Sequence, residues 1–157
     1  MGCIFYSRGK KLSGGVILDG HELSEQKRGY LKGDFALFHL KDMKDMQFEY
    51  HYHDFNKIII FISGSVTYLI EGKAYRLRPW DVLFVSSSEV HKPVIDPTSY
   101  YERVVIWVNP GFLQKHSYET DLNTCFCLAR ERKNNLLRPD PDSANEIMRL
   151  VHSLEEA

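Results

Sequence analysis

The sequence predicts a mainly β protein, an antiparallel sandwich or barrel that is followed by one or two α-helices. Short apolar segments rich in β-branched and aromatic residues succeed one another between residues 34 and 108, with turn residues but no helical period between them. Strands that follow one another in this way are typical of antiparallel sandwiches and barrels. The aromatic content of 13% also favours strands, because rings fit a half-buried pleated surface.

Residues 1–33 are polar and interrupted by several glycines. Because glycine disfavours regular structure, we expect an N-terminal arm that wraps the domain, with one short strand over residues 15–18. Little free energy is needed to reorder such a segment, so it is the natural candidate for a lid.

The β-domain is expected over residues 34–128. Gly64 and Gly72 mark two of the turns between its strands. In chain order, the expected strands are residues 35–40, 46–53, 57–63, 66–71, 74–77, 82–86, 90–95 and 101–108, with a further one at 125–129.

Helix signals follow the last long strand. Asn109 suits the N-cap of a short helix that continues over residues 111–116. A second helix opens at Pro141, where Ser143 and Glu146 have the spacing of a capping box.

Residues 129–157 are expected to form a linker and this terminal helix. Four apolar residues recur along one of its faces at three- and four-residue spacing: Ile147, Leu150, Val151 and Leu154. A helix this short is marginal in isolation, so the stripe must pack against another surface, and we assign it to a homodimer interface. The pattern is still running at Ala157, which leads us to expect that the chain was cut from a longer protein.

The composition argues against several classes of function. A net charge of −1 supplies no field that would hold nucleic-acid phosphates. The longest apolar run, residues 58–62, is too short to span a bilayer, and no secretory signal is visible. Three sparse cysteines fit a reduced protein, so we expect a cytoplasmic domain without membrane contact.

Three histidines are the main candidates for chemistry. His51 and His53 are two residues apart, so on a strand they would share one face, and His91 begins a later strand. In a barrel these side chains can converge on one point. Three neutral imidazoles suit zinc, iron, nickel or copper, with coordination positions left over for water or a ligand.

Two segments around these histidines resemble known motifs. The sequence His51-Tyr52-His53, the strand at 57–62 and Gly64 resemble the first cupin motif, and residues 77–85 with His91 resemble the second. The His-x-His-Asp-Phe-Asn pattern and the continuation over residues 101–113 are similar to the N-terminal sensor domains of AraC-type transcription regulators. The resemblance covers roughly residues 34 to 155.

This resemblance implies a cupin fold, a double-stranded β-helix or jelly-roll barrel, that binds a small effector. It also implies that helices after the barrel pair two subunits and that helix-turn-helix units beyond this chain read the DNA. Nothing in residues 1–157 resembles such a reading unit.

Two positions depart from the cupin pattern. Lys57 stands where metal-binding cupins usually carry a glutamate, and an ammonium has no lone pair and repels a cation. Lys57 can instead pair with an anionic effector, such as a sugar acid or another carboxylate. Trp80 replaces the glycine of the second motif's turn. Because tryptophan adopts positive φ only at a cost, we expect a different turn there, with the indole at the barrel mouth or packed at its edge.

The sequence thus predicts the effector-sensing and dimerisation domain of a bacterial regulator, and not an enzyme. We expect the ligand site to include His51, His53, Lys57, Tyr68, His91 and Trp107, although Tyr68 and Trp107 also suit the core. A stand-alone metal-dependent cupin enzyme, an isomerase or dioxygenase with Glu49 beside the histidines, is the alternative. A purely structural dimerisation domain is the third reading.

Overall fold

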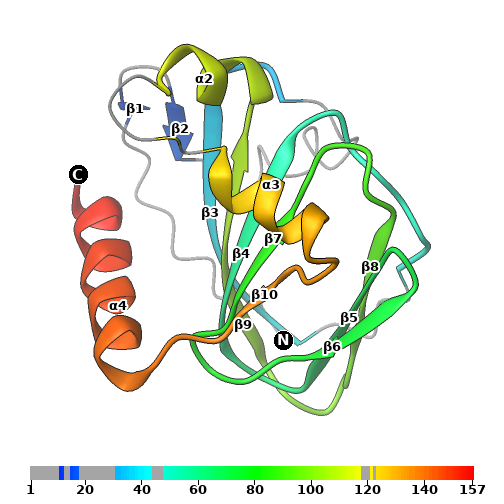
Figure 1. Cartoon of the computed structure of the whole chain (residues 1–157). Helices are drawn as coiled ribbons and strands as arrows, with labels where there is room; N and C mark the ends of the chain where they lie inside the picture. Colours follow the sequence, from blue (N-terminus) through cyan, green and yellow to red (C-terminus); the bar gives the residue numbers. More distant parts are fainter. Residues whose placement is uncertain (1–10, 13–14, 18–30, 44–47, 118–120, 122) are drawn as a thin grey trace.

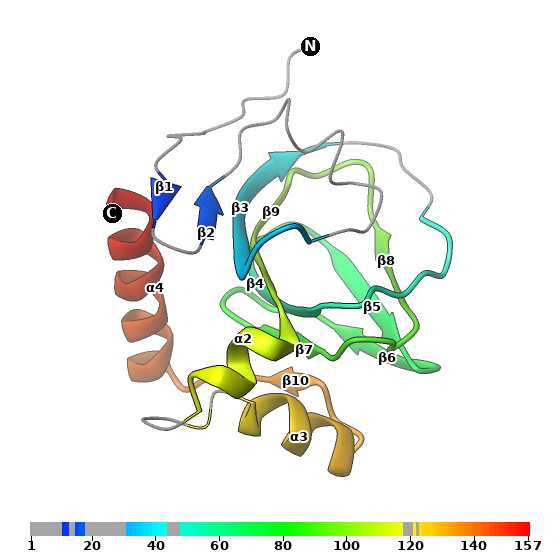
Figure 2. The same cartoon turned by 90° about the horizontal axis from the view of Figure 1, so that it is seen from above.

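A computed structural model describes residues 11–12, 15–17, 31–43, 48–117, 121 and 123–157, which form two facing β-sheets and three helices (Figures 1 and 2). The larger sheet has seven strands, in the spatial order β1 (Lys11–Leu12), β2 (Gly15–Ile17), β3 (Phe35–Asp42), β9 (Tyr101–Val108), β4 (Asn56–Ser63), β7 (Val82–Val85) and β10 (Leu136–Leu137). The smaller sheet has three, in the order β6 (Lys73–Arg76), β5 (Val66–Ile70) and β8 (His91–Ile95). All neighbouring strands are antiparallel except β2 and β3.

The main core lies between the two sheets. Strand side chains alternate between faces, so Ile59 and Phe61 of β4 point inward together with Leu83 and Val85 of β7. They pack against residues of the small sheet and of β9: Val66, Tyr68, Ile70, Tyr75 and Tyr101. By the same alternation, Lys57 of β4 belongs to the inner face. The predicted barrel is confirmed.

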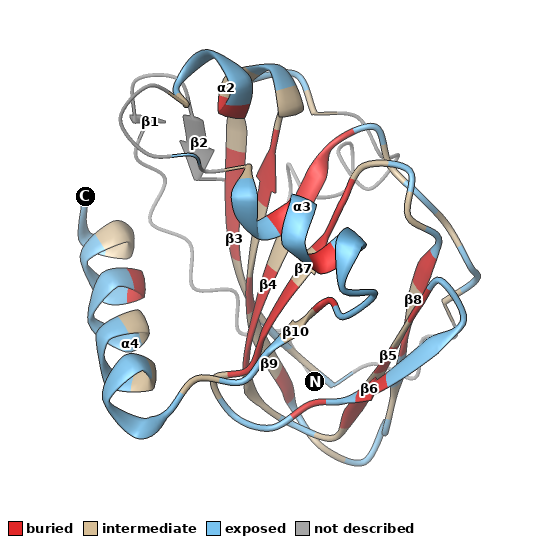
Figure 3. Cartoon of the chain, in the orientation of Figure 1, coloured by how far each residue is buried: buried red, intermediate tan, exposed pale blue. Residues whose placement is uncertain are grey.

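Three helices cover the outside. Helix α2 (Pro110–Lys115) and helix α3 (Thr124–Glu131) contribute Leu113 and Phe126 to a cluster with Val108 of β9. Helix α4 (Pro141–Glu156) packs on the outer face of the large sheet, which it meets with a stripe of partly buried residues around the buried Val151 (Figure 3). Among the described residues, no helix is long and apolar enough to cross a membrane.

The terminal stripe is divided between two environments. Ile147, Val151 and Leu154 pack against the chain's own sheet, whereas Leu150 is 62% exposed. The dimer interface stays a prediction, and of the four residues Leu150 is the one left free for it.

Two expected strands were wrong. Residues 46–47 lie outside the described residues, and 48–53 form an open segment, held by a bridge between His51 and His91 and by the Ser88 N–H, which donates to the His53 carbonyl at 2.8 Å. Residues 125–129 belong to helix α3, because Phe126 and Ala129, three apart, are buried on one side while Cys127 is exposed.

Of the two predicted helix starts, one needs correction. The N-cap of α4 is Asp140, whose carboxylate accepts the Ser143 N–H at 2.9 Å, so Ser143 is not the cap. Asn109 does cap α2, with its side chain 2.8 Å from the Gly111 nitrogen.

Trp80 does adopt a positive φ, of 71°, so the expected departure of this turn was wrong. The Trp80 N–H donates to the Phe61 carbonyl at 2.6 Å, and the Asp81 carboxylate accepts the Arg78 N–H at 2.8 Å. These bonds hold the turn, and the indole packs with the cluster under α4, which includes Val151. Packing and hydrogen bonds therefore offset the backbone strain.

Candidate functional site

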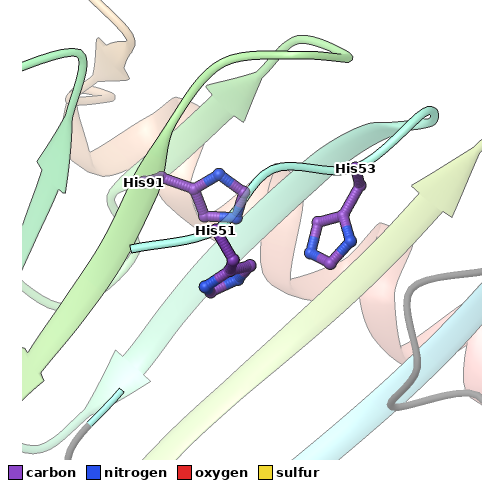
Figure 4. A group of neighbouring side chains, drawn as sticks. All are labelled: His51, His53 and His91. Carbon is purple, nitrogen blue, oxygen red and sulfur yellow. The ribbon is translucent and has the colours of Figure 1, made fainter. Parts of the chain in front are cut away.

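Three imidazoles converge inside the barrel (Figure 4). His51 and His53 come from the segment before β4, and His91 begins β8. One ring nitrogen from each lies within 4.8 Å of the others. The centroid of the His91 ring is 4.4 Å from that of His51 and 5.4 Å from that of His53. Two backbone hydrogen bonds join the segment before β4 to β8. The His91 N–H donates to the His51 carbonyl at 2.9 Å, and the His51 N–H donates to the His91 carbonyl at 3.2 Å.

Hydrogen bonds to backbone carbonyls fix the tautomers of two rings. His51 Nδ1 donates to the Glu49 carbonyl, and His91 Nδ1 donates to the Glu89 carbonyl, each at 2.9 Å. A neutral imidazole that donates from Nδ1 is an acceptor at Nε2. Both rings therefore offer an Nε2 lone pair.

Lys57 is buried beside this cluster, with an exposed fraction of 8%. Its Nζ lies 3.2 Å from His91 Nε2, to which it donates a hydrogen bond. Within the described part of the chain, no carboxylate forms an ion pair with Lys57. Burial lowers the pKa of its ammonium to about 7.

Burial also keeps the histidines neutral. It lowers the pKa of His53 and of His91 to about 3, with a second contribution from the charge of Lys57. The pKa of His51 is lowered as well, chiefly by burial. At neutral pH the site thus holds three neutral imidazoles around Lys57, which exchanges between ammonium and amine at that pH.

An aromatic wall adjoins the histidines. His53 stacks on Phe55 with ring centroids 4.6 Å apart, and Phe55 stacks on Trp107 at 4.5 Å. Trp107 is buried, and its Nε1 has no hydrogen-bond partner among the described residues. A buried indole N–H usually finds a partner, so this donor is available to a ligand.

The structure thus brings together five of the six ligand-site candidates. His51, His53, Lys57 and His91 cluster directly, and Trp107 joins them through Phe55. Tyr68 lies apart in the main core, where its hydroxyl bonds with that of Tyr101. Phe55 was missed, although its position two residues after His53 places it on the same face of an extended segment.

A comparison of the sequence with known families decides the identity of this barrel. Residues 35–157 match the model of the AraC-like ligand binding domain. The chain belongs to this family. Its strands build the cupin fold, a double-stranded β-helix with C-terminal helices.

Other comparisons add partial similarities. The chain is similar to a cupin-family protein with a double-stranded β-helix fold from Methanocaldococcus jannaschii, at 16% identity over 48% of this chain and 70% of that one, with a TM-score of 0.42. It is similar to a cupin-2 domain containing protein from Shewanella frigidimarina at 17% identity over 48% and 72%, with a TM-score of 0.41. It is also similar to a putative mannose-6-phosphate isomerase from Ralstonia eutropha, at 15% identity over 48% of this chain and 75% of that one, with a TM-score of 0.44. No curated protein matches the chain.

In this AraC-like domain the three imidazoles could hold a metal ion, because their nitrogens are close enough together and neutral. Lys57 opposes such an ion, since its Nζ already engages the Nε2 lone pair of His91. The three imidazoles therefore supply enough donor nitrogens for a metal ion, but the ammonium of Lys57 competes with it for His91.

Neither carboxylate that could serve an enzymatic mechanism contacts the histidine rings through its side chain among the described residues. Glu49 is exposed and gives only its backbone carbonyl to His51. The Glu89 carboxylate accepts hydrogen bonds from the Ser86 N–H at 2.7 Å and from Asn135 Nδ2 at 3.0 Å.

Proposed function

We propose that this AraC-like domain senses a small effector inside its barrel and controls a DNA-binding unit that lies outside residues 1–157 of a bacterial, cytoplasmic regulator. The observation that carries the proposal is Lys57, an inward-facing and buried lysine beside three neutral imidazoles, without an ion pair in the described chain. Burial of an unpaired ammonium is costly, so a site that retains one is suited to an anion.

The effector is an acid, a sugar acid or another small carboxylate. Its carboxylate pairs with Lys57, and the free indole N–H of Trp107 supplies a second donor. Hydroxyl groups of the effector donate to the Nε2 lone pair that His51 offers. Such a complementary set of donors and acceptors gives orientation and specificity in a small-molecule site.

The signal is a shift between two arrangements of barrel, arm and dimer, of which the effector binds one more tightly. A homodimer through α4 belongs to this proposal, with the exposed Leu150 at its centre. The metal-dependent enzyme stays the second candidate, favoured by the clustered nitrogens alone.

A thermal-shift and calorimetry panel tests the effector class. The panel compares neutral hexoses with the matching aldonic and uronic acids, and with benzoate as an aromatic acid. We expect stabilisation by one acid class and none by the neutral hexoses; a ligand at about one hundred times its Kd stabilises by about 2.7 kcal/mol.

Lys57→Met should weaken binding of that acid by about 30-fold or more, because removal of one partner of a buried charged pair costs about 2–5 kcal/mol. Lys92→Met is the matched control: Lys92 is on the same strand as His91, but its ammonium lies over the Tyr50 ring, 4.4 Å from the centroid. Equal binding of a neutral hexose by wild type and Lys57→Met would overturn the acidic effector.

A further inference from the structure

Asn135 is a buried polar residue between α3 and β10, with an exposed fraction of 5%. Its Nδ2 donates to the Phe84 carbonyl at 2.8 Å and to Glu89 Oε2 at 3.0 Å. Its backbone N–H donates to the Tyr75 hydroxyl at 3.1 Å, and that hydroxyl donates to Asn135 Oδ1 at 3.3 Å. The backbone carbonyl of Asn135 accepts the Phe84 N–H at 2.9 Å. Each polar atom of this residue is therefore engaged.

Glu89 connects Asn135 to the histidine cluster. Its carboxylate accepts from Asn135, and its backbone carbonyl accepts the Nδ1–H of His91. That second bond decides that His91 carries its proton on Nδ1 and offers Nε2 to Lys57. A displacement of the His91 ring therefore acts directly on the residue that holds Asn135.

The chain after Asn135 is fixed to β7 up to the start of α4. Leu136 pairs with Leu83, and Leu137 pairs with Val82. Arg138 then donates to both oxygens of Asp81, at 2.9 and 2.7 Å. Asp140 caps α4 two residues later. Figure 1 shows this path, from β10 beside β7 to the first turn of α4.

We infer that Glu89 and Asn135 are positioning residues for the effector site: the backbone carbonyl of Glu89 sets the tautomer of His91, and the side-chain bond between Glu89 and Asn135 transmits a change at that ring to the segment leading into α4. That an effector is what displaces the His91 ring rests on the proposed function; the connection from His91 to α4 does not. Asn135 is buried with all its polar atoms engaged and Glu89 is half-buried, so one broken bond leaves polar groups unpaired and the two residues move together.

The test uses Lys57→Met as the trigger, because this substitution removes the donor to His91 Nε2 without any effector. Two signals are followed: the tautomer of His91, by ¹⁵N–¹H correlation spectra of the imidazoles, and hydrogen exchange of the amides at 135–140. We expect Lys57→Met to change exchange at 135–140 by about three- to tenfold relative to the amides of β3, a strand outside this path, within the range of energetic coupling between sites.

The response to Lys57→Met is also measured in three variants that change the contacts between Glu89, Asn135 and Tyr75. Glu89→Ala should abolish the response at 135–140 but keep the tautomer of His91, because the backbone carbonyl remains, and Glu89→Gln, which keeps an acceptor oxygen, should restore the response. Tyr75→Phe is the matched control, because it removes two hydrogen bonds from Asn135 but leaves the bond to Glu89. It should lower stability and keep the response. If Glu89→Ala does not fold, Asn135→Leu, which removes the Nδ2 donor at nearly the same size without adding a charge, replaces it.

An equal response to Lys57→Met with and without the Glu89–Asn135 bond would overturn the inference, as would the lack of any response in the otherwise wild-type chain. Because no effector enters the test, a failed search for acidic effectors leaves this result standing. Conversely, a negative result here leaves effector binding intact.

Discussion

Replacement of Lys57 by methionine should make the domain more stable, by an amount that depends on pH. The ammonium is buried, and its pKa falls from 10.5 in the unfolded chain to about 7 in the folded one. Between these two values the unfolded chain binds more protons, so wild-type stability rises with pH across this window and is lowest below pH 7. The total rise is about 5 kcal/mol, at 1.36 kcal/mol per pKa unit.

Methionine has nearly the same length and no charge, so it abolishes this cost. It also leaves His91 Nε2 without its donor, which costs about 1–2 kcal/mol. We therefore expect Lys57→Met to raise the free energy of unfolding by about 3 kcal/mol at pH 7, and to lower it slightly near pH 10, where wild-type lysine is buried neutral and keeps the hydrogen bond.

Urea unfolding at pH 6, 7, 8.5 and 10, followed by tryptophan fluorescence and circular dichroism, measures this difference. Lys92→Met, which removes a lysine outside the barrel, should show no such pH dependence. If Lys57→Met is less stable than wild type at every pH by the same amount, the ammonium is compensated in the folded state and the reasoning fails.

Four further expectations follow from the site and the surface. Protein purified without added metal should carry less than one transition ion per chain by elemental analysis, and Lys57→Glu should gain one; a stoichiometric wild-type ion that is lost in His51→Ala would favour the enzyme. Stability should fall as pH drops from 6.5 to 3 in acid titrations followed by circular dichroism, because the pKa of His53 and of His91 is held at about 3 by burial and the unfolded chain takes up their protons first. Residues 1–157 alone should give no gel shift with duplex DNA at physiological salt, and a specific shift would contradict the division of labour. Leu150→Asp should convert a dimer to a monomer in sedimentation while the β-rich circular dichroism survives; a wild-type monomer at high concentration would show that α4 is not a sufficient interface.

The two-residue period of strands explains how far the sequence could predict the site. It places His51 and His53 on one face, and it places Lys57 on the face of Ile59 and Phe61, which the structure confirms. The convergence of His91 with them needed the cupin resemblance, because nothing local in the sequence pairs these two segments.

Short segments and strained turns were harder to predict. The apolar content of residues 125–129 is compatible with a strand and with a helix. Only the burial of Phe126 and Ala129 on one side identifies the helix. At Trp80 the backbone preference of the residue was outweighed by bonds to Phe61 and by packing under α4, neither of which is visible locally.

The bonds that fix the start of α4 join residues far apart in the chain: Arg138 lies 57 positions from Asp81. Asp81 is only 1% exposed but the Arg138 side chain is 39% exposed, so loss of this partly solvated cation would cost about 1–3 kcal/mol. If α4 moved by breaking the Arg138–Asp81 pair, the effector would have to supply that free energy, because a ligand shifts an equilibrium only by its difference in affinity for the two states. The lower-energy route keeps Arg138 on Asp81 and moves α4 together with β7, the strand that also leads into the turn before His91. Coupling between the barrel site and α4 is therefore expected to run from Glu89 through Asn135 into β10, which stays paired with β7, while the Arg138–Asp81 pair stays intact.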